Sequence, residues 1–185
     1  MHIDLHQGIP PPRPVSFPNM KPQLLLFPLV IALSPCVFSG CGKNESAGGA
    51  TESVGPDGVR TIKLTGSDTL QYNLKEITAA PGEKLYIELT NTGSMPKQTM
   101  SHNFVLLQPM PDADVQALAM AASTKPAEFL PDDQSKIISH TKMLGTGEKE
   151  TLTIIAPPQA GNYPYVCTFP GHFALMHGNL VVKPK

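Results

Sequence analysis

The chain has 185 residues, of which 41% are hydrophobic and 16% are charged, and its 14 Lys and Arg residues nearly balance 15 Asp and Glu residues. This length provides one ordinary domain with appendages and excludes a large multidomain enzyme. The formal net charge of −1 offers no basic excess to neutralise a phosphate backbone, so we expect no nucleic-acid partner. The hydrophobic fraction indicates a folded chain, and short Thr, Ile, Val and Leu runs between Gly and Pro predict a β-rich domain.

Residues 1–41 are interpreted as a dispensable extension followed by an export signal. Residues 1–19 contain five prolines and no periodic apolar pattern, so they cannot build a core. From Met20, a lysine, an apolar stretch over 24–33 and several small residues follow in the order of a secretory signal peptide. The apolar stretch is too short to span a bilayer. A leader that began at Met1 would have an unusually long, proline-rich beginning, so we favour Met20 as the start.

The end of this segment, Phe38-Ser39-Gly40-Cys41, resembles the lipobox of bacterial lipoproteins, in which cleavage leaves the cysteine as a lipidated N-terminus. The small residues before Cys41 fit that pattern, whereas Phe38 stands where such proteins prefer Leu. Two acyl chains would anchor the protein stably, since one chain alone binds a membrane only marginally. The alternative is an ordinary signal peptide that is removed together with Cys36 and Cys41.

Residues 60–185 are expected to form the folded domain, after a flexible linker over 42–59 that is rich in Gly, Ser, Glu and Asn. Short runs with β-branched and aromatic residues, separated by turn residues, suit a Greek-key β-sandwich or barrel. One segment, 112–122, has apolar residues at helical spacing behind a candidate N-cap, Asp112, and predicts a single short helix outside the sheets. The expected strands are 61–64, 70–72, 83–90, 103–108, 137–141, 150–155, 163–167 and 179–182.

Cys167 is the only cysteine of this expected domain, and potential metal ligands follow it closely. An exported domain with one cysteine cannot form an internal disulfide, and a lone thiol in an oxidising compartment is a liability unless something binds it. His172 and Met176 follow Cys167 within ten residues, on one loop between two expected strands, and His102 stands at the start of an earlier strand. Two imidazoles, one thiolate and a weak thioether form the ligand set of a blue-copper electron-transfer site.

Copper fits this donor set better than zinc does. Thiolate and thioether are soft donors that favour Cu(I), and imidazole suits both oxidation states, whereas structural zinc sites prefer closely spaced Cys or Cys/His pairs. Taken alone, Cys167 would also suit a buried small hydrophobe or a nucleophile, and Met176 would suit a core residue. His140 and His177 are expected to be surface imidazoles.

At these residues the domain resembles azurin-like members of the cupredoxin (plastocyanin/azurin) family. The sequence CTFPGHFALMHG has the Cys-x4-His-x3-Met spacing of azurin-like copper loops, and MSHNFVLL resembles their first-ligand strand. The resemblance covers most of 60–185 and implies an all-β cupredoxin Greek-key fold with one type 1 copper ion. It also implies that His102, Cys167 and His172 are equatorial ligands and that Met176 is a long axial ligand.

The resemblance assigns roles to the neighbours of these ligands as well. Ser101 would offer its carbonyl as a weak axial contact, although the family usually has Gly there. Asn103 would tie the two ligand-bearing segments together, and the backbone amides of Asn103 and Phe169 would donate to the thiolate and tune the potential. An apolar docking patch at the exposed edge of His172 would consist of Met95, Met100, Pro170 and Phe173.

These features predict an exported one-electron carrier that cycles between Cu(II) and Cu(I), not an enzyme, because four ligands leave no open position for a substrate. Its partners would be redox proteins such as cytochromes or copper oxidoreductases. It would lie in the periplasm or on an outer membrane face, held by the lipid on Cys41. The alternative is a copper storage or delivery protein without electron turnover. A binding module fits less well because the ligands are intact, and a nitrite reductase would need a second copper site.

The sequence also departs from the azurin pattern. The family's usual disulfide is absent, so the domain must hold its N-terminal region without that link. The buried Trp that is common in azurins has no counterpart, since the chain contains no Trp. Asn91 stands where some azurins have a titrating His, so we expect no pH-linked behaviour from that position.

Overall fold

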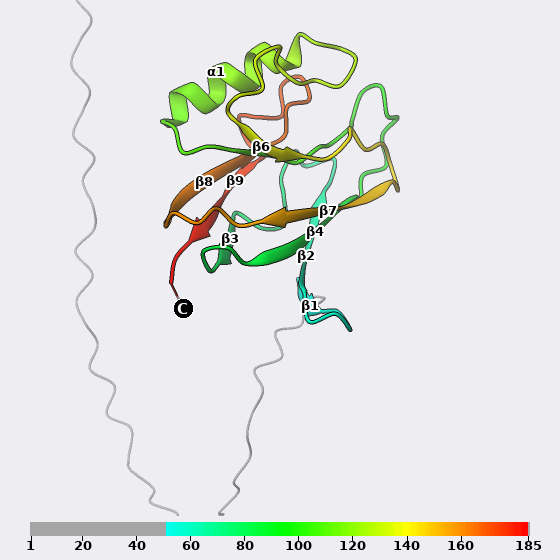
Figure 1. Ribbon diagram of the computed structural model, residues 1–185. Coiled ribbons are helices and arrows are strands. Elements are labelled where there is room, and N and C mark those ends of the chain that lie inside the picture. The colour runs from blue at the N-terminus through cyan, green and yellow to red at the C-terminus, as the bar shows by residue number, and fades with distance from the viewer. Residues whose placement is uncertain (1–50, 185) are drawn as a thin grey trace, which may run out of the picture. The chain divides into compact units, whose positions relative to one another are not determined.

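The computed structural model describes residues 51–184, which form two β-sheets and one helix (Figure 1). One sheet has strand order β1-β2-β4-β7, and the other has strand order β3-β9-β8-β5-β6. Strands β2 and β4 pair in parallel, as do β3 and β9, and the other pairs are antiparallel. The elements are β1 (Glu52–Val54), β2 (Arg60–Gly66), β3 (Glu76–Ala79), β4 (Lys84–Asn91), β5 (Val105–Leu107), α1 (Asp112–Ser123), β6 (Ile137–His140), β7 (Lys149–Ile155), β8 (Gly161–Val166) and β9 (His177–Val182).

The main core lies between the two sheets and follows from the alternation of apolar residues. In β4, Leu85, Ile87 and Leu89 are fully buried, and the residues between them are half-buried, as in a strand with one face against a core. Strand β2 places Ile62 and Leu64 in register beside Ile87 and Leu89. The opposite sheet closes this core with Ile77, Leu106, Tyr163, Tyr165, Leu180 and Val182.

Helix α1 lies outside the sandwich, over the face of the five-stranded sheet that points away from the main core (Figure 1). Val115 and Ala119 of the helix form a second apolar cluster with Val105, Leu107 and Val166. Strand β5 is therefore buried on both faces, which restrains the segment just after His102. The single short helix outside the sheets is the arrangement expected from the sequence.

Several boundaries differ from those expected. The N-cap of α1 is Pro111, without a side-chain cap hydrogen bond, so Asp112 is not the N-cap but lies in the first turn, where a carboxylate favours the positive end of the helix dipole. Residues 70–72 do not form a strand: Leu70 has φ 58°, and Tyr72 makes only an isolated bridge to Gly66. Strand β3 was not expected, because its four residues carry little apolar signal.

Among the described residues, regular secondary structure begins before the expected domain start at residue 60. Strand β1 pairs antiparallel with β2, so the expected linker over 42–59 is not free of secondary structure. The predicted signal peptide, the lipobox-like Cys41 and the linker residues before 51 lie outside the described residues. Within 51–184, no helix is both long and apolar enough to cross a membrane.

Candidate metal centre

Three predicted ligands converge at one end of the sandwich. Cys167 directly follows β8, His172 lies on the loop from there to β9, and His102 precedes β5. One ligand atom from each lies within 4.8 Å of the others, and all three residues are buried. The Cys167 Sγ is 3.6 Å from His172 Nδ1, and the two imidazole centroids are 5.1 Å apart. Among the described residues, this is the group of His, Cys, Asp and Glu side chains able to hold a metal ion.

Backbone hydrogen bonds fold the loop that joins Cys167 to Met176. The amide of Cys167 donates to the carbonyl of Met176 at 2.9 Å, which closes the loop at its base. The amide of Met176 donates to the carbonyl of His172 at 2.8 Å, and that of His172 donates to the carbonyl of Phe169 at 3.0 Å. The Cys-x4-His-x3-Met spacing therefore corresponds to a loop closed by backbone hydrogen bonds. This loop brings the side chains of Cys167, His172 and Met176 together.

Gly66, at the end of β2, brings the axial candidate next to the first histidine. A Cβ atom at Gly66 would lie 2.4 Å from Met176 Cε and 2.8 Å from His102 Cδ2, so both side chains pack directly on this backbone. Met176 is fully buried. Gly66 was not predicted as a site residue, although a glycine inside a strand pattern signals a close backbone approach.

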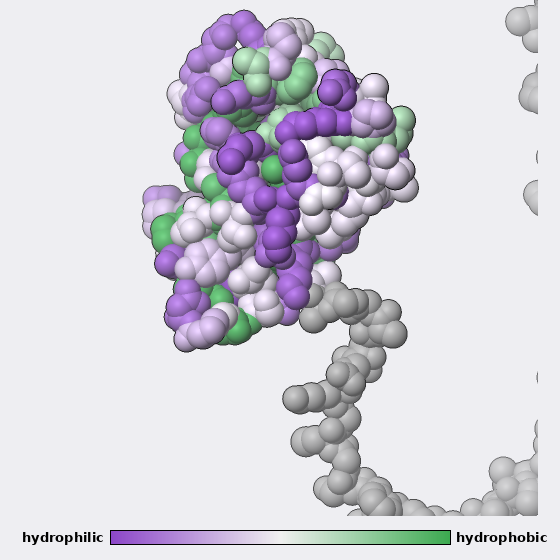
Figure 2. Space-filling view, turned by 90° about the vertical axis from the view of Figure 1, so that its right-hand side faces the viewer, coloured by the Kyte–Doolittle hydropathy of each residue, from purple (hydrophilic) through white to green (hydrophobic). Residues whose placement is uncertain are grey.

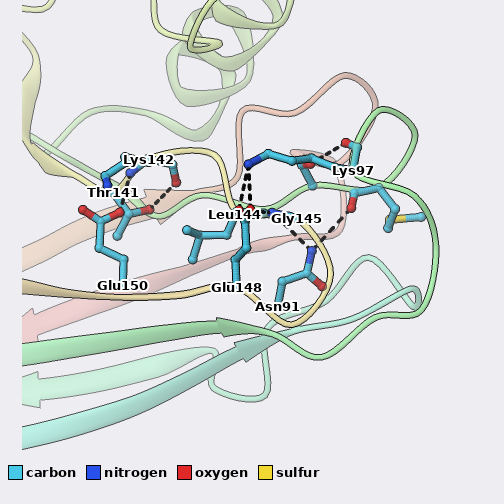
Figure 3. A network of polar contacts seen from close by, with 10 residues as sticks. Asn91, Lys97, Thr141, Lys142, Leu144, Gly145, Glu148 and Glu150 are labelled. Carbon is cyan, nitrogen blue, oxygen red and sulfur yellow. Dashed lines mark hydrogen bonds and ion pairs between the residues drawn. The ribbon is translucent and has the colours of Figure 1, made fainter.

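The backbone of His102 is held by hydrogen bonds to a neighbouring loop. Its amide donates to the carbonyl of Leu144 at 3.0 Å, and the amide of Leu144 donates back to His102 at 2.8 Å. The Asn91 side chain donates to the same Leu144 carbonyl at 3.0 Å (Figure 3). Farther out, Lys97 and Glu148 form an ion pair at 2.7 Å that joins two loops of this end (Figure 3). Asn91 thus supports His102 indirectly, because both donate to the carbonyl of Leu144.

Asn103 ties the two ligand-bearing segments together, as the resemblance implied. Its Nδ2 donates to Thr168 Oγ1 at 2.8 Å, and the Thr168 amide donates to Asn103 Oδ1 at 2.9 Å. The Thr168 hydroxyl donates in turn to the carbonyl of Phe129. Thr168 was not singled out from the sequence, because its partners are distant along the chain.

The Ser101 carbonyl faces the site from the side of His102. Its oxygen lies 4.0 Å from Cys167 Sγ, and the Ser101 hydroxyl donates to the carbonyl of Lys97. Ser101 is 1% exposed, so a serine is accommodated at the position where the family usually has glycine. Its side chain fixes the preceding loop rather than entering the site.

The electrostatics of the three side chains suit a soft cation. Burial raises the pKa of the Cys167 thiol to about 12, and the backbone amides of Asn103 and Phe169 oppose this only in part. Burial, and then the neighbouring His102, lower the pKa of His172 to about 4, and burial also lowers the pKa of His102. Both imidazoles are therefore neutral near pH 7. Neither ring nitrogen of His102 has a hydrogen-bond partner among the described residues, an orphaned donor set that a metal ion would satisfy.

The expected docking patch is only partly exposed. Met95 is 42% exposed, Pro170 is exposed and Phe173 is half-buried, but Met100 is 9% exposed and is therefore a packing residue rather than a docking residue. Leu175, which the sequence analysis did not name, is 52% exposed on the same loop as His172. His172 itself is 3% exposed and contacts the Phe169 ring at a centroid distance of 4.6 Å.

The other two histidines of the described residues do not belong to the ligand group. His140 is half-buried on β6, and His177 is exposed at the start of β9. Figure 2 views the domain from the right-hand side of Figure 1 and shows hydrophilic residues running down the centre of this face, with hydrophobic residues in smaller groups. This face therefore carries no single broad apolar surface.

Comparison with known proteins agrees with this geometry. Residues 60–183 match the family described as copper binding proteins, plastocyanin/azurin family. An azurin of Pseudomonas aeruginosa is 36% identical over 128 residues, covering 66% of this chain and 84% of its own. An azurin of Pseudomonas chlororaphis is 37% identical over 125 residues, covering 66% and 97%.

Two solved auracyanin structures are also similar to this chain. Auracyanin from Roseiflexus castenholzii has a TM-score of 0.59 at 35% identity, covering 67% of this chain and 97% of its own. Auracyanin A from Chloroflexus aurantiacus, described as a "blue" copper protein, has a TM-score of 0.60 at 33% identity, covering 66% and 98%. The expected cupredoxin fold is thus confirmed, with two sheets and one helix.

Proposed function

Because the chain belongs to the plastocyanin/azurin family of copper-binding proteins, we propose that it carries single electrons between redox partners on one type 1 copper ion. The observation that carries this proposal is the buried convergence of one thiol and two neutral imidazoles within 4.8 Å. Cys167, His102 and His172 would hold the copper ion, and Met176, packed beside His102 on Gly66, would add a weak thioether donor.

The bound copper supplies the one-electron chemistry by alternating between Cu(II) and Cu(I). The protein holds the donor atoms in one arrangement, since His102, Cys167 and Met176 are each fixed by backbone hydrogen bonds. Full burial of Cys167 and Met176 excludes water from the site. The backbone amides of Asn103 and Phe169 favour negative charge on the sulfur, which tunes the potential.

Electrons would enter and leave at the edge of His172. Pro170 and Leu175 on the same loop are exposed, and Met95 lies exposed on the loop before His102. A small apolar contact of this kind suits a short-lived encounter, because electron-transfer interfaces have a small buried area. Four filled ligand positions would leave no place for a substrate, which supports a carrier rather than an enzyme.

The protein would work outside the cytoplasm, tethered through lipid on Cys41. The support for this is the signal-peptide pattern from Met20 and the small residues before Cys41. Mass analysis of the protein recovered from membranes would show two acyl chains on an N-terminal Cys41. Recovery of a shorter, unmodified chain would instead favour the ordinary signal peptide.

The visible and EPR spectra of the Cu(II)-loaded protein test the copper site, with Cys167→Ser as the control. An intense thiolate-to-copper charge-transfer band that is absent from Cys167→Ser would support the proposal, and a colourless protein would refute it. Fast electron self-exchange would favour the carrier. Slow self-exchange together with copper transfer to an apo-acceptor would favour storage or delivery.

A further inference from the structure

The segment 72–75, between the end of β2 and the start of β3, contacts all three ligand-bearing parts of the site. The Tyr72 hydroxyl donates to the carbonyl of Asn103, the residue after His102. The Leu74 carbonyl accepts from the hydroxyl of Tyr165, which lies two residues before Cys167, at 2.9 Å. The Lys75 ammonium donates to the carbonyl of Leu175, the residue before Met176, at 2.6 Å. We call residues 72–75 the brace.

The two hydroxyls of this arrangement are fixed by packing. Tyr72 is 3% exposed, and its ring meets the Tyr165 ring edge-on at a centroid distance of 5.5 Å. A Cβ atom at Gly178 would lie 2.3 Å from the Tyr165 hydroxyl and 2.7 Å from the Lys75 carbonyl, so the chain has a glycine where these groups need the space. Neither tyrosine can turn away without breaking the core, and both therefore restrain the backbone they contact.

Lys75 adds a positive charge to this support. The Leu175 carbonyl that it contacts belongs to a tight turn, since the amides of Leu175 and Met176 both donate to the carbonyl of His172. No carboxylate of the described residues forms an ion pair with Lys75. Its charge is therefore available to the loop, and a nearby cation disfavours the more positive Cu(II) state relative to Cu(I).

We propose that the brace positions the copper ligands from outside the ligand set, Tyr72 through the Asn103 carbonyl and Lys75 through the Leu175 carbonyl, and that Lys75 raises the reduction potential. The potential part rests on the proposed electron-carrier function. The positioning part does not, because it concerns hydrogen bonds between protein groups. Tyr72 and Lys75 are positioning residues and touch no metal.

The positioning part is tested by Tyr72→Phe in the metal-free protein, with Tyr163→Phe as the matched control. Tyr163 also donates its hydroxyl to a backbone carbonyl, that of Gln159, but away from the site. Tyr72→Phe should speed amide hydrogen exchange at Thr168, whose amide donates to Asn103, by about fivefold, as expected for the loss of one hydrogen bond. Tyr163→Phe should leave this rate unchanged. Equal rates in the two variants would overturn the positioning role.

The charge part is tested by the midpoint potential of Lys75→Met, with Lys75→Arg and Lys183→Met beside it. Lys75→Met should lower the potential, Lys75→Arg should retain it, and Lys183→Met should change it less than Lys75→Met does. A Lys75→Met protein with an unaltered visible spectrum and the same potential as Lys183→Met would overturn this role. If the unmutated protein gives no thiolate-to-copper band, the proposed function fails, and the exchange experiment still decides the brace.

Discussion

Replacing Arg60 with Met tests how the N-terminal region is held without a disulfide. Arg60 begins β2, and its guanidinium joins Glu52 on β1 at 3.1 Å and Glu83, just before β4, at 3.0 Å. It also donates to the carbonyl of Thr78 on β3 at 2.6 Å. Strand β3 belongs to the other sheet, so one side chain links the two layers at their edge.

The magnitude follows from the exposure of each partner. The Glu52 side chain is 47% exposed, so this ion pair contributes about 0.5 kcal/mol. The Glu83 side chain is 16% exposed, and hydrogen bonds from a charged group to it and to Thr78 together contribute about 1.5–2.5 kcal/mol, after allowance for the 21% exposure of Arg60. Arg60→Met should therefore lower the free energy of unfolding by about 2–3 kcal/mol. For a domain of this size the melting temperature should fall by about 6–15 °C.

Urea unfolding of the metal-free protein measures this loss, and Lys125→Met is the control. Lys125 forms an ion pair with Asp132, but the two side chains are 44% and 82% exposed, so the control should change the free energy of unfolding by about 0.5 kcal/mol or less. Arg60→Met and Glu83→Gln should be less destabilising together than the sum of the single variants. A loss for Arg60→Met no greater than that for Lys125→Met, or strict additivity with Glu83→Gln, would refute the linking role.

Three other outcomes are expected. Gly66→Ala should shift Met176 and His102, because the new Cβ would meet both, and should alter the EPR spectrum of the copper-loaded protein; an unchanged spectrum would contradict their packing on Gly66. Met100→Ala should destabilise the domain by about 2–4 kcal/mol, because Met100 is buried. Met95→Ala should leave the stability unchanged and slow electron transfer to a partner, because Met95 is exposed. Similar unfolding midpoints for the two variants would contradict the burial of Met100. The metal-free protein should lose stability as the pH falls from 6.5 towards 4, because burial lowers the pKa of His172 to about 4 and the unfolded chain takes up the proton first. It should also lose stability above pH 9, where the unfolded chain releases the Cys167 proton before the folded one, whose thiol pKa is about 12. Because burial also raises the pKa values of Tyr72 and Tyr165, Cys167→Ser should reduce this alkaline loss without abolishing it and should leave the acid loss unchanged; urea unfolding against pH measures both.

The sequence predicted the long strands because their burial follows a local period. Strand β4 alternates along eight residues, and this pattern suffices to place it. Strand β1 is exposed along its whole length, so no alternation could indicate it. Residues 70–72 showed the opposite problem: they contain apolar residues, but Leu70 adopts a left-handed conformation that no apolar pattern reveals.

The residues of the candidate site also fall into those that the sequence predicted and those that only the fold reveals. His172 and Met176 were found because they stand a few residues from Cys167 on one loop. His102 lies far away in the sequence; its place at the start of an expected strand made it a candidate, and the family resemblance implied its role as a ligand. Gly66 and Thr168 escaped because their importance comes from contacts between segments that only the fold brings together. The burial of loop residues could not be predicted from the sequence either. Met95 and Met100 lie five residues apart on the loop before His102, yet Met95 is exposed and Met100 is buried.

The hydrogen bonds around the site act mainly on the neighbours and backbone of the ligands. The Asn103 and Thr168 side chains bond to each other, His102 pairs with Leu144 through the backbone, and the loop from Cys167 closes on itself. None of these bonds uses a side-chain donor atom of the site, so the convergence of the donor atoms is supported by the protein around them. A site arranged by its surroundings has little freedom to follow the different preferences of Cu(I) and Cu(II). We therefore expect the ligands to move little when an electron arrives or leaves, which is the property that a one-electron carrier requires.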